Sequence, residues 1–228
     1  MSKLDDRNII IRRSRKQIEE LMNVMILGCV IAGVYLMLSN PDAGVVLTST
    51  GVENLKFFTV LSNIFCGIVA AAALVMSFCG KRMPVLPKLM AAAAVSLTFM
   101  IVAAVLAPLY PDYDMYAGSN RMFHLIVPLV AMVDFVFLNV DGKIPFKYTL
   151  ISAVLSLVYG NFYLGNILIN GIGVWPESND WYGFLNWGWP MGIAIFAFVI
   201  FMNWLLACAL LFLNSLVNKL LRKMSKQA

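Results

Sequence analysis

Residues 89–109 read LMAAAAVSLTFMIVAAVLAPL and contain no charged side chain. A helix of this length rises about 30 Å, which matches the thickness of the hydrocarbon core of a bilayer. The segment is therefore predicted to cross a membrane as an α-helix. With five similar runs it gives six predicted transmembrane helices, at residues 21–38, 57–78, 89–109, 123–140, 148–169 and 189–213.

The composition leaves little of the chain for anything but these helices. Of 228 residues, 61% are hydrophobic and 13% are charged. Since the connections between the runs are short, a folded soluble domain is excluded. We expect one domain over residues 1–228, an all-α polytopic membrane bundle with six transmembrane helices. Residues 1–18 and 214–228 are expected to be basic tails.

The positive charges predict the orientation of this bundle. Of the 17 Lys and Arg residues, 15 lie in the two tails and in the connections after the second and fourth runs. The positive-inside rule places these segments, and hence both termini, in the cytoplasm. The net charge of +5 then reflects membrane orientation, so nucleic acid is not an expected partner. We expect an integral membrane protein, located in the plasma membrane if the source is prokaryotic.

The sequence predicts no metal site and no cofactor. The four cysteines lie within or at the ends of apolar runs and lack the spacing of metal ligands. The chain has a single histidine, His124. Nucleotide-binding loops and the nucleophile elbow of soluble hydrolases are also missing from the sequence.

The connection over residues 170–188 is the longest on the outer side and is rich in aromatic residues. It contains Trp175, Trp181, Tyr182 and Trp187. Such residues are typical of the aromatic belt at a membrane interface. A lid over a cavity that opens outward is the alternative, and the two interpretations are compatible.

Polar side chains within the apolar runs follow helical faces. Such side chains usually face protein or a water-filled cavity. On the second run, Thr59, Ser62, Asn63 and Cys66 share a face. One face of the fifth run carries Ser152, Ser156, Tyr159, Tyr163, Asn166 and Asn170. Hydrogen bonds between helices are the common use of such side chains, and for the face of the fifth run a lined cavity is an equal alternative.

Thr59 and His124 are predicted to lie at the same depth in the outer leaflet. Thr59 follows the outer cation Lys56 by three residues, and His124 follows the outer cation Arg121 by three residues. If their helices are neighbours, the hydroxyl and the imidazole can form a nucleophile–base pair. A Thr that bonds its own helix, and a structural or proton-binding His, are the alternatives.

Asp134 is predicted to lie about 15 Å deeper than His124, near the midplane of the membrane. It is off the His124 face, so it is not an obvious partner of the imidazole. We expect it to be protonated, hydrogen-bonded or connected to water, with the Ser and Tyr face of the fifth run as a candidate partner.

Two short segments resemble a known family. Residues 57–63, Phe-Phe-Thr-Val-Leu-Ser-Asn, resemble the second-helix motif of the androgen-induced-protein-like family of six-helix membrane proteins. His124 with Pro128, followed by Asp134, resembles the second motif of that family. Animal members are threonine hydrolases of fatty acid esters of hydroxy fatty acids. The resemblance implies Thr59 as nucleophile and His124 as base, although the interval between the two motifs is longer in the animal proteins.

Two classes of function follow. The first is an intramembrane lipid-ester hydrolase whose substrate is a fatty acid ester of a hydroxy fatty acid or a similar acyl lipid, with the Asn63 and Asn166 amides as candidate oxyanion donors. The second is a binding protein or transporter without catalysis, with a proton site at His124 and Asp134. The residues predicted to contact substrate are Ser62, Asn63, Asp134, Tyr163 and Asn166.

Overall fold

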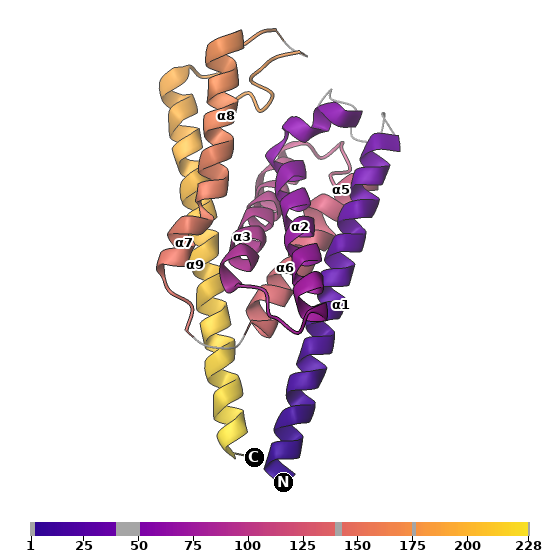
Figure 1. Cartoon of the computed structure of the whole chain (residues 1–228). Helices are drawn as coiled ribbons and strands as arrows, with labels where there is room; N and C mark the ends of the chain where they lie inside the picture. The colour runs from indigo at the N-terminus through magenta and orange to yellow at the C-terminus, as the bar shows by residue number, and fades with distance from the viewer. Residues whose placement is uncertain (1–2, 40–50, 140–142, 175–176, 228) are drawn as a thin grey trace.

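The computed structural model describes residues 3–39, 51–139, 143–174 and 177–227, and these residues form helices and connections without a strand. Six helical spans are long and apolar enough to cross a membrane: Arg13–Ser39, Phe58–Phe78, Val85–Leu109, Gly118–Leu138, Lys147–Asn170 and Trp189–Met224. Both termini lie at the same end of the bundle (Figure 1). The predicted all-α class with six helices is confirmed.

Several spans are built from more than one helical segment. The first two spans are single helices, α1 (Lys3–Ser39) and α2 (Phe58–Phe78), and the 3-10 turn η1 (Gly51–Lys56) precedes α2. The third joins α3 (Val85–Ile101), η2 (Val102–Leu106) and α4 (Ala107–Leu109). The fourth joins α5 (Gly118–Arg121), η3 (Met122–Ile126), α6 (Val127–Val133) and η4 (Asp134–Leu138). The fifth joins α7 (Lys147–Ser152) and α8 (Val154–Asn170), and the sixth is α9 (Trp189–Gln227).

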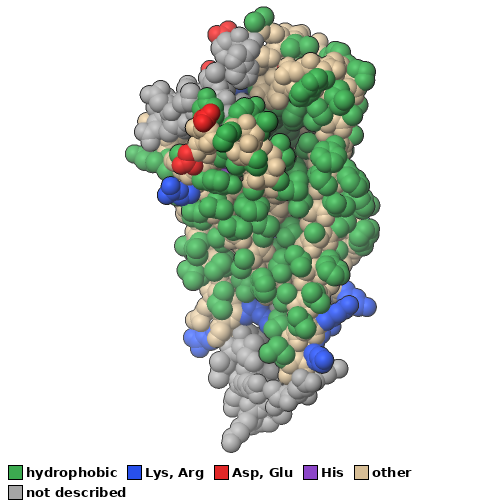
Figure 2. Space-filling model, turned by 180° about the vertical axis from the view of Figure 1, so that it is seen from behind, with side chains coloured by type: hydrophobic (Ala, Val, Ile, Leu, Met, Phe, Trp, Pro, Cys, Tyr) green, Lys and Arg blue, Asp and Glu red, His purple; other side chains and the backbone are tan. Residues whose placement is uncertain are grey.

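The two terminal helices are longer than the sequence predicted. Both α1 and α9 continue beyond the bundle at the end that holds the termini (Figure 1), so the predicted tails at 1–18 and 214–228 are largely extensions of helices. Lys and Arg side chains gather near this end of the molecule (Figure 2). We call it the inner end, because the positive-inside rule assigns it to the cytoplasm, and the opposite end is the outer end.

Helix α3 occupies the centre of the bundle. It packs against α2, α6, α7 and α9. Its four consecutive alanines, residues 91–94, are at most 3% exposed. Small side chains let neighbouring helices approach closely, which is the main way that membrane helices gain packing energy. The alanine run therefore explains why α3 is surrounded by other helices.

Three of the helical turns, η2, η3 and η4, are π-helical. Two of them end two residues before a proline, since η2 ends at Leu106 before Pro108 and η3 ends at Ile126 before Pro128. A proline lacks the N–H that would bond the carbonyl four residues earlier, and the helix adjusts locally. For Pro128 that carbonyl belongs to His124. Two of these turns lie in the fourth span and contain His124 and Asp134. Because π-turns are frequent at functional sites, this span is a candidate location for such a site.

Candidate functional site

His124 is held in one orientation by a backbone carbonyl. It lies in η3, its side chain is buried, and its Nδ1 is 2.7 Å from the carbonyl oxygen of Met115. A carbonyl oxygen only accepts, so Nδ1 carries the hydrogen and donates it. In the neutral ring Nε2 is then the acceptor, which is the state that a general base requires.

Asn63 joins the turn of α2 that contains Thr59 to the turn that contains His124. Its Nδ2 donates to the carbonyl oxygen of Thr59 at 2.7 Å and to that of Phe123 at 3.1 Å. The second and fourth spans are therefore neighbours, as the pairing of Thr59 with His124 requires. Among the hydrogen bonds of the described residues, none connects the half-buried Thr59 hydroxyl to the His124 ring.

The two amides predicted as oxyanion donors have other partners. Asn63 uses both of its amide hydrogens on the two carbonyls. Asn166 donates to Asn179 of the outer loop at 3.0 Å. It also lies seven residues beyond Tyr159, which bonds the carbonyl of Lys56 just before α2, so it is about 10 Å farther out than the start of α2. Neither amide is therefore placed to donate a hydrogen bond to the carbonyl of an ester substrate beside the Thr59 hydroxyl in this arrangement.

An apolar groove of about 380 Å³ runs between α2 and α8 in the outer half of the bundle. Phe58, Ser62 and Phe65 line it from α2, and Tyr159 and Tyr163 line it from α8. Lys56 and Trp181 close its outer end. The predicted substrate contacts Ser62 and Tyr163 thus meet at one groove, where Ser62 also bonds the carbonyl of Thr59.

The groove does not include the other predicted residues. We expected Thr59, His124 and Asp134 to border the same space as the polar face of the fifth run, but none of the three lines the groove. The reason is helical geometry, because Thr59 is 100° around α2 from Phe58 and so turns away from α8. The inner part of that polar face is used for packing, since Ser152 and Ser156 are buried and bond the nearby carbonyls of Tyr148 and Ala153 in the same span.

The outer loop is folded over the outer ends of α2 and α8. Asp180 is 4% exposed and accepts hydrogen bonds from the Tyr163 hydroxyl and from the backbone N–H groups of Phe184 and Leu185. The Tyr182 hydroxyl accepts a 2.9 Å bond from the N–H of Phe58. These bonds give Tyr163 a structural partner and fix the loop above the groove.

The tryptophans of this loop divide between the two predicted roles. Trp181 donates from Nε1 to the Tyr159 hydroxyl at 3.1 Å and packs against the Tyr163 ring, so it covers the groove. Trp187 is 72% exposed, as expected for a residue of an aromatic belt. Trp175 lies outside the described residues. The loop therefore combines a cover with an interfacial anchor.

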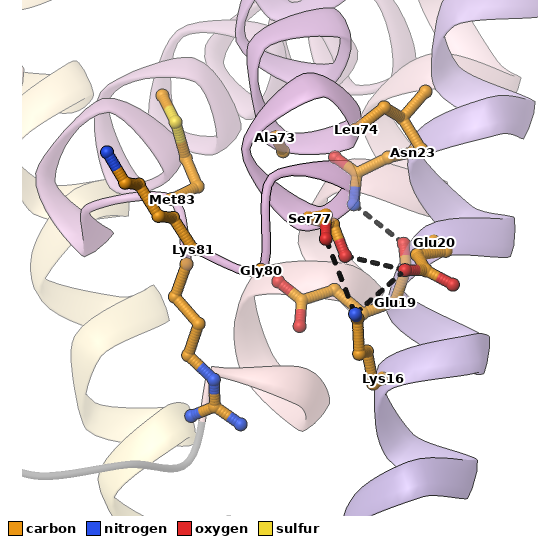
Figure 3. A pocket seen from close by; sticks show the side chains of 11 residues that line it. Lys16, Glu19, Glu20, Asn23, Ala73, Leu74, Ser77, Gly80, Lys81 and Met83 are labelled. Atoms are coloured by element: carbon orange, nitrogen blue, oxygen red, sulfur yellow. Dashed lines mark hydrogen bonds and ion pairs between the residues drawn. The ribbon is translucent and has the colours of Figure 1, made fainter.

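Asp134 is not bonded to the fifth span, and that prediction was wrong. Its Oδ2 accepts a 2.9 Å bond from the ammonium of Lys88, which also bonds Glu19 at 2.6 Å. Asp134 lies one turn before the end of the fourth span at Leu138, so it is near the inner end and not at the midplane. A separate polar pocket of about 120 Å³ opens beside Glu19 at this end (Figure 3).

Lys88 is the buried charged residue that sequence reasoning missed. Its charge placed it in the connection after the second run, whereas α3 begins at Val85 and buries Lys88 to 4% exposure. A signal was available, because prolines are favoured in the first turn of a helix and Pro87 lies there. A helix that starts at Val85 places Lys88 inside the bundle.

Comparisons with protein-family models, with curated proteins and with solved structures find no match to this chain. The family resemblance consequently rests on the two short segments around Thr59 and His124. Within the described residues, no group of three or more His, Cys, Asp or Glu side chains is placed to hold a metal ion. The fold is that of a six-helix, multi-pass membrane protein.

Proposed function

We propose that the chain is an intramembrane hydrolase of acyl esters, with Thr59 as nucleophile and His124 as general base. The observation that carries this proposal is the orientation of His124. Its Nδ1 is occupied by the Met115 carbonyl, which leaves Nε2 as the acceptor on a helix that Asn63 ties to the Thr59 turn. Hydroxyl–imidazole pairs in other hydrolases depend on a similar third group that orients the base.

The proposed reaction has two stages. Nε2 of His124 takes the proton of the Thr59 hydroxyl as its oxygen attacks the ester carbonyl carbon. The bond to the alcohol then breaks, the alcohol leaves with the proton from His124, and an acyl-threonine remains. Water activated by the same imidazole hydrolyses the acyl-threonine and releases the fatty acid. Rotation of the Thr59 side chain would close the pair when substrate binds, since catalytic hydrogen bonds often tighten only in the complex.

The groove between α2 and α8 supports an acyl chain as part of the substrate. Its volume lies within the range of small-molecule sites, and its lining is mostly aromatic and aliphatic. Lys56 at its outer end offers a cation to a carboxylate. The resemblance suggests a fatty acid ester of a hydroxy fatty acid as the substrate class, and the plasma membrane is the proposed location.

A second function is favoured by one observation. Thr59 and His124 do not line the groove, which fits a protein that binds an apolar chain without reacting with it. In that case His124 is a structural residue, held by Met115. A joint proton site at His124 and Asp134 has no support, because Asp134 belongs to the inner end.

Turnover of a fluorogenic medium-chain ester by the purified protein separates the two functions. We expect Thr59→Ala and His124→Ala each to lower turnover by at least about 1,000-fold, because a nucleophile and its base act as a unit. Thr59→Ser should retain part of the activity. Thr149→Ala is the matched control, since that Thr bonds the carbonyl of Phe146 just before α7 and the Trp204 side chain of α9, and is remote from the pair.

The thermal melt of each variant shows whether it is folded. Turnover that persists in folded Thr59→Ala would exclude Thr59 as nucleophile. Wild-type protein without turnover, but with saturable binding of a fluorescent fatty acid that Ser62→Phe removes by filling the groove, would establish the binding function instead.

A further inference from the structure

Three charged side chains from three spans meet inside the inner half of the bundle. Lys88 of α3 lies between Glu19 of α1 and Asp134 of η4, at 2.6 and 2.9 Å. The side chains of Lys88 and Asp134 are 3% and 5% exposed, and that of Glu19 is 27% exposed. The ester hydrolase proposed for the outer half has no role for this triad.

Within the triad itself carboxylates outnumber ammonium groups by two to one, whereas the cations Lys16, Lys81 and Arg82 line the polar pocket on the Glu19 side. Two carboxylates share a single ammonium, and buried charge without compensation is costly. The other polar groups that face Asp134 are Asn23 of α1 and the thiol of Cys66, and neither carries a compensating positive charge. Asn214 of α9 donates its amide hydrogens to the carbonyls of Phe135 and Val136 in the fourth span and of Asn139 just after it.

Asp134 also has an unused acceptor. Within the described part of the chain its Oδ1 is buried and has no hydrogen-bond partner. Asp134 borders a small cavity of about 10 Å³ that is also lined by Asn23, Cys66 and Lys88. Such a volume is close to the smallest that holds one water molecule. Asp134 thus combines an unpartnered oxygen with an adjacent space that suits a water molecule.

A polar pocket connects the triad to the inner surface. It is lined by Lys16, Glu19, Glu20, Asn23 and Ser77, among others, and Figure 3 shows these side chains around its opening between α1 and α2. The side chains at its rim are exposed, including Lys16 at 52%. Asn23 borders both this pocket and the cavity beside Asp134, so polar groups continue from the surface to the unpartnered oxygen.

We propose that Asp134 is a proton-binding site that exchanges with the cytoplasm through Glu19 and Lys88. A proton from water in the pocket binds the Glu19 carboxylate. Lys88 passes one of its own protons to Asp134 and takes the proton of Glu19 in return. Glu19 is then again a carboxylate, Lys88 is again an ammonium, and the net change is one proton on Asp134.

Neutral Asp134 leaves Lys88 paired with Glu19 alone, so the buried cluster becomes electrically neutral. The contact between α3 and the inner end of the fourth span then loses its ion pair. Proton uptake is in this way coupled to the packing of α3 against η4. The path uses charged residues from α1, α3 and the fourth span, and it is independent of chemistry at Thr59.

Infrared difference spectroscopy of the full chain in lipid nanodiscs tests the proposal. Acidification from mildly alkaline to mildly acidic buffer should produce a narrow stretching band of a protonated carboxyl in an apolar site. Asp134→Asn should remove that band, whereas Asp112→Asn, which changes an exposed outer residue, should keep it. Lys88→Gln should show the band already in alkaline buffer, because the ammonium no longer favours the carboxylate.

Glu19→Gln tests the route, and the band should appear more slowly after a pH jump in this variant. A second measurement needs no variant. Dicyclohexylcarbodiimide, an apolar reagent for protonated carboxyls, should modify Asp134 of the wild type in acidic buffer and not in alkaline buffer, as read by peptide mass. A band that is missing in the wild type or unchanged in folded Asp134→Asn, or modification confined to Glu19 or Glu20, would overturn the proposal.

Discussion

Two aspartates are buried at opposite ends of this bundle, and their surroundings differ in kind. Asp180 is 4% exposed at the outer end, and both of its oxygens accept hydrogen bonds from a phenol and two backbone N–H groups. Asp134 is 3% exposed at the inner end, and among the described residues it has one ammonium partner and one oxygen without a partner. A fully bonded carboxylate fixes a loop in place, whereas an incompletely bonded one has capacity to bind something else.

The two ends also differ in the interactions that hold them together. At the outer end aromatic rings and neutral donors surround Asp180, and Tyr163 contacts Trp181, Tyr182 and Phe184. At the inner end a single ammonium connects three spans. Loss of one residue should therefore cost more at the inner end, where it leaves an unpaired charge, than at the outer end, where the remaining contacts persist.

Lys88→Met should give the largest loss of stability in the molecule. Removal of one partner from a buried ion pair typically costs about 3–5 kcal/mol, because Asp134 loses its counterion and can stay buried only by binding a proton. The measurement is the free energy of unfolding in detergent by titration with a denaturing detergent. Lys81→Met is the matched control, since Lys81 is exposed at the same end and should lose almost nothing. Equal stability of the two variants would show that the triad is not a structural centre.

Asp180→Asn should give an intermediate loss of stability, smaller than that of Lys88→Met. The amide keeps the shape of the carboxylate, but one of its two ends can no longer accept from Tyr163 or from the backbone. Hydrogen bonds to a charged group contribute about 1.5–3 kcal/mol each. The loop should loosen, and proteolysis of intact vesicles from the outside should cleave within 171–188 more readily. Asp112→Asn should leave the cleavage rate unchanged.

The sequence predicted the outer end better than the inner end. Spacing and charge located six spans, and the aromatic composition of residues 170–188 pointed to a cover as well as a belt. The pairing of Thr59 with His124 was made conditional on neighbouring second and fourth spans, and these spans are in contact. These features could be predicted because each depends on a local pattern, such as an apolar run or a helical face, that can be identified within a single sequence.

The contacts of the two buried aspartates could not be predicted in this way. Asp180 meets Tyr163 across 17 positions and Lys88 meets Asp134 across 46, and helical spacing sets neither pairing. Lys88 was placed in a connection because a charge usually ends a membrane span. Depth counted along one helix also misplaced Asp134, since it ignored where the fourth span ends. The missing information is how the helices rotate against one another.

Tyr182→Phe should give the smallest loss of stability at neutral pH. The pH dependence of that loss distinguishes the outer end from the inner end. The substitution removes the hydroxyl that accepts from the N–H of Phe58, at a cost of about 0.5–1.5 kcal/mol. Burial, with the neighbouring Tyr159, raises the pKa of Tyr182 well above its ordinary value. The folded protein thus keeps Tyr182 neutral at a pH where the unfolded chain loses the proton. Its contribution to stability is complete below about pH 10, the ordinary pKa of tyrosine, and is lost as the pH rises toward the folded value.

The measurement for this prediction is the melting temperature of wild type and Tyr182→Phe from neutral to strongly alkaline buffer. Wild type should lose stability above about pH 10, and the variant should lose less over the same interval because it has one tyrosine fewer to ionise. The same scan separates the two ends, since Lys88→Met leaves the outer tyrosines in place and should keep the alkaline decline of the wild type. A variant curve parallel to that of the wild type would mean that ionisation of Tyr182 does not limit the outer end. The alkaline decline would then have to arise from other tyrosines of the same cluster, such as Tyr159 or Tyr163, which Tyr159→Phe and Tyr163→Phe would identify in the same scan.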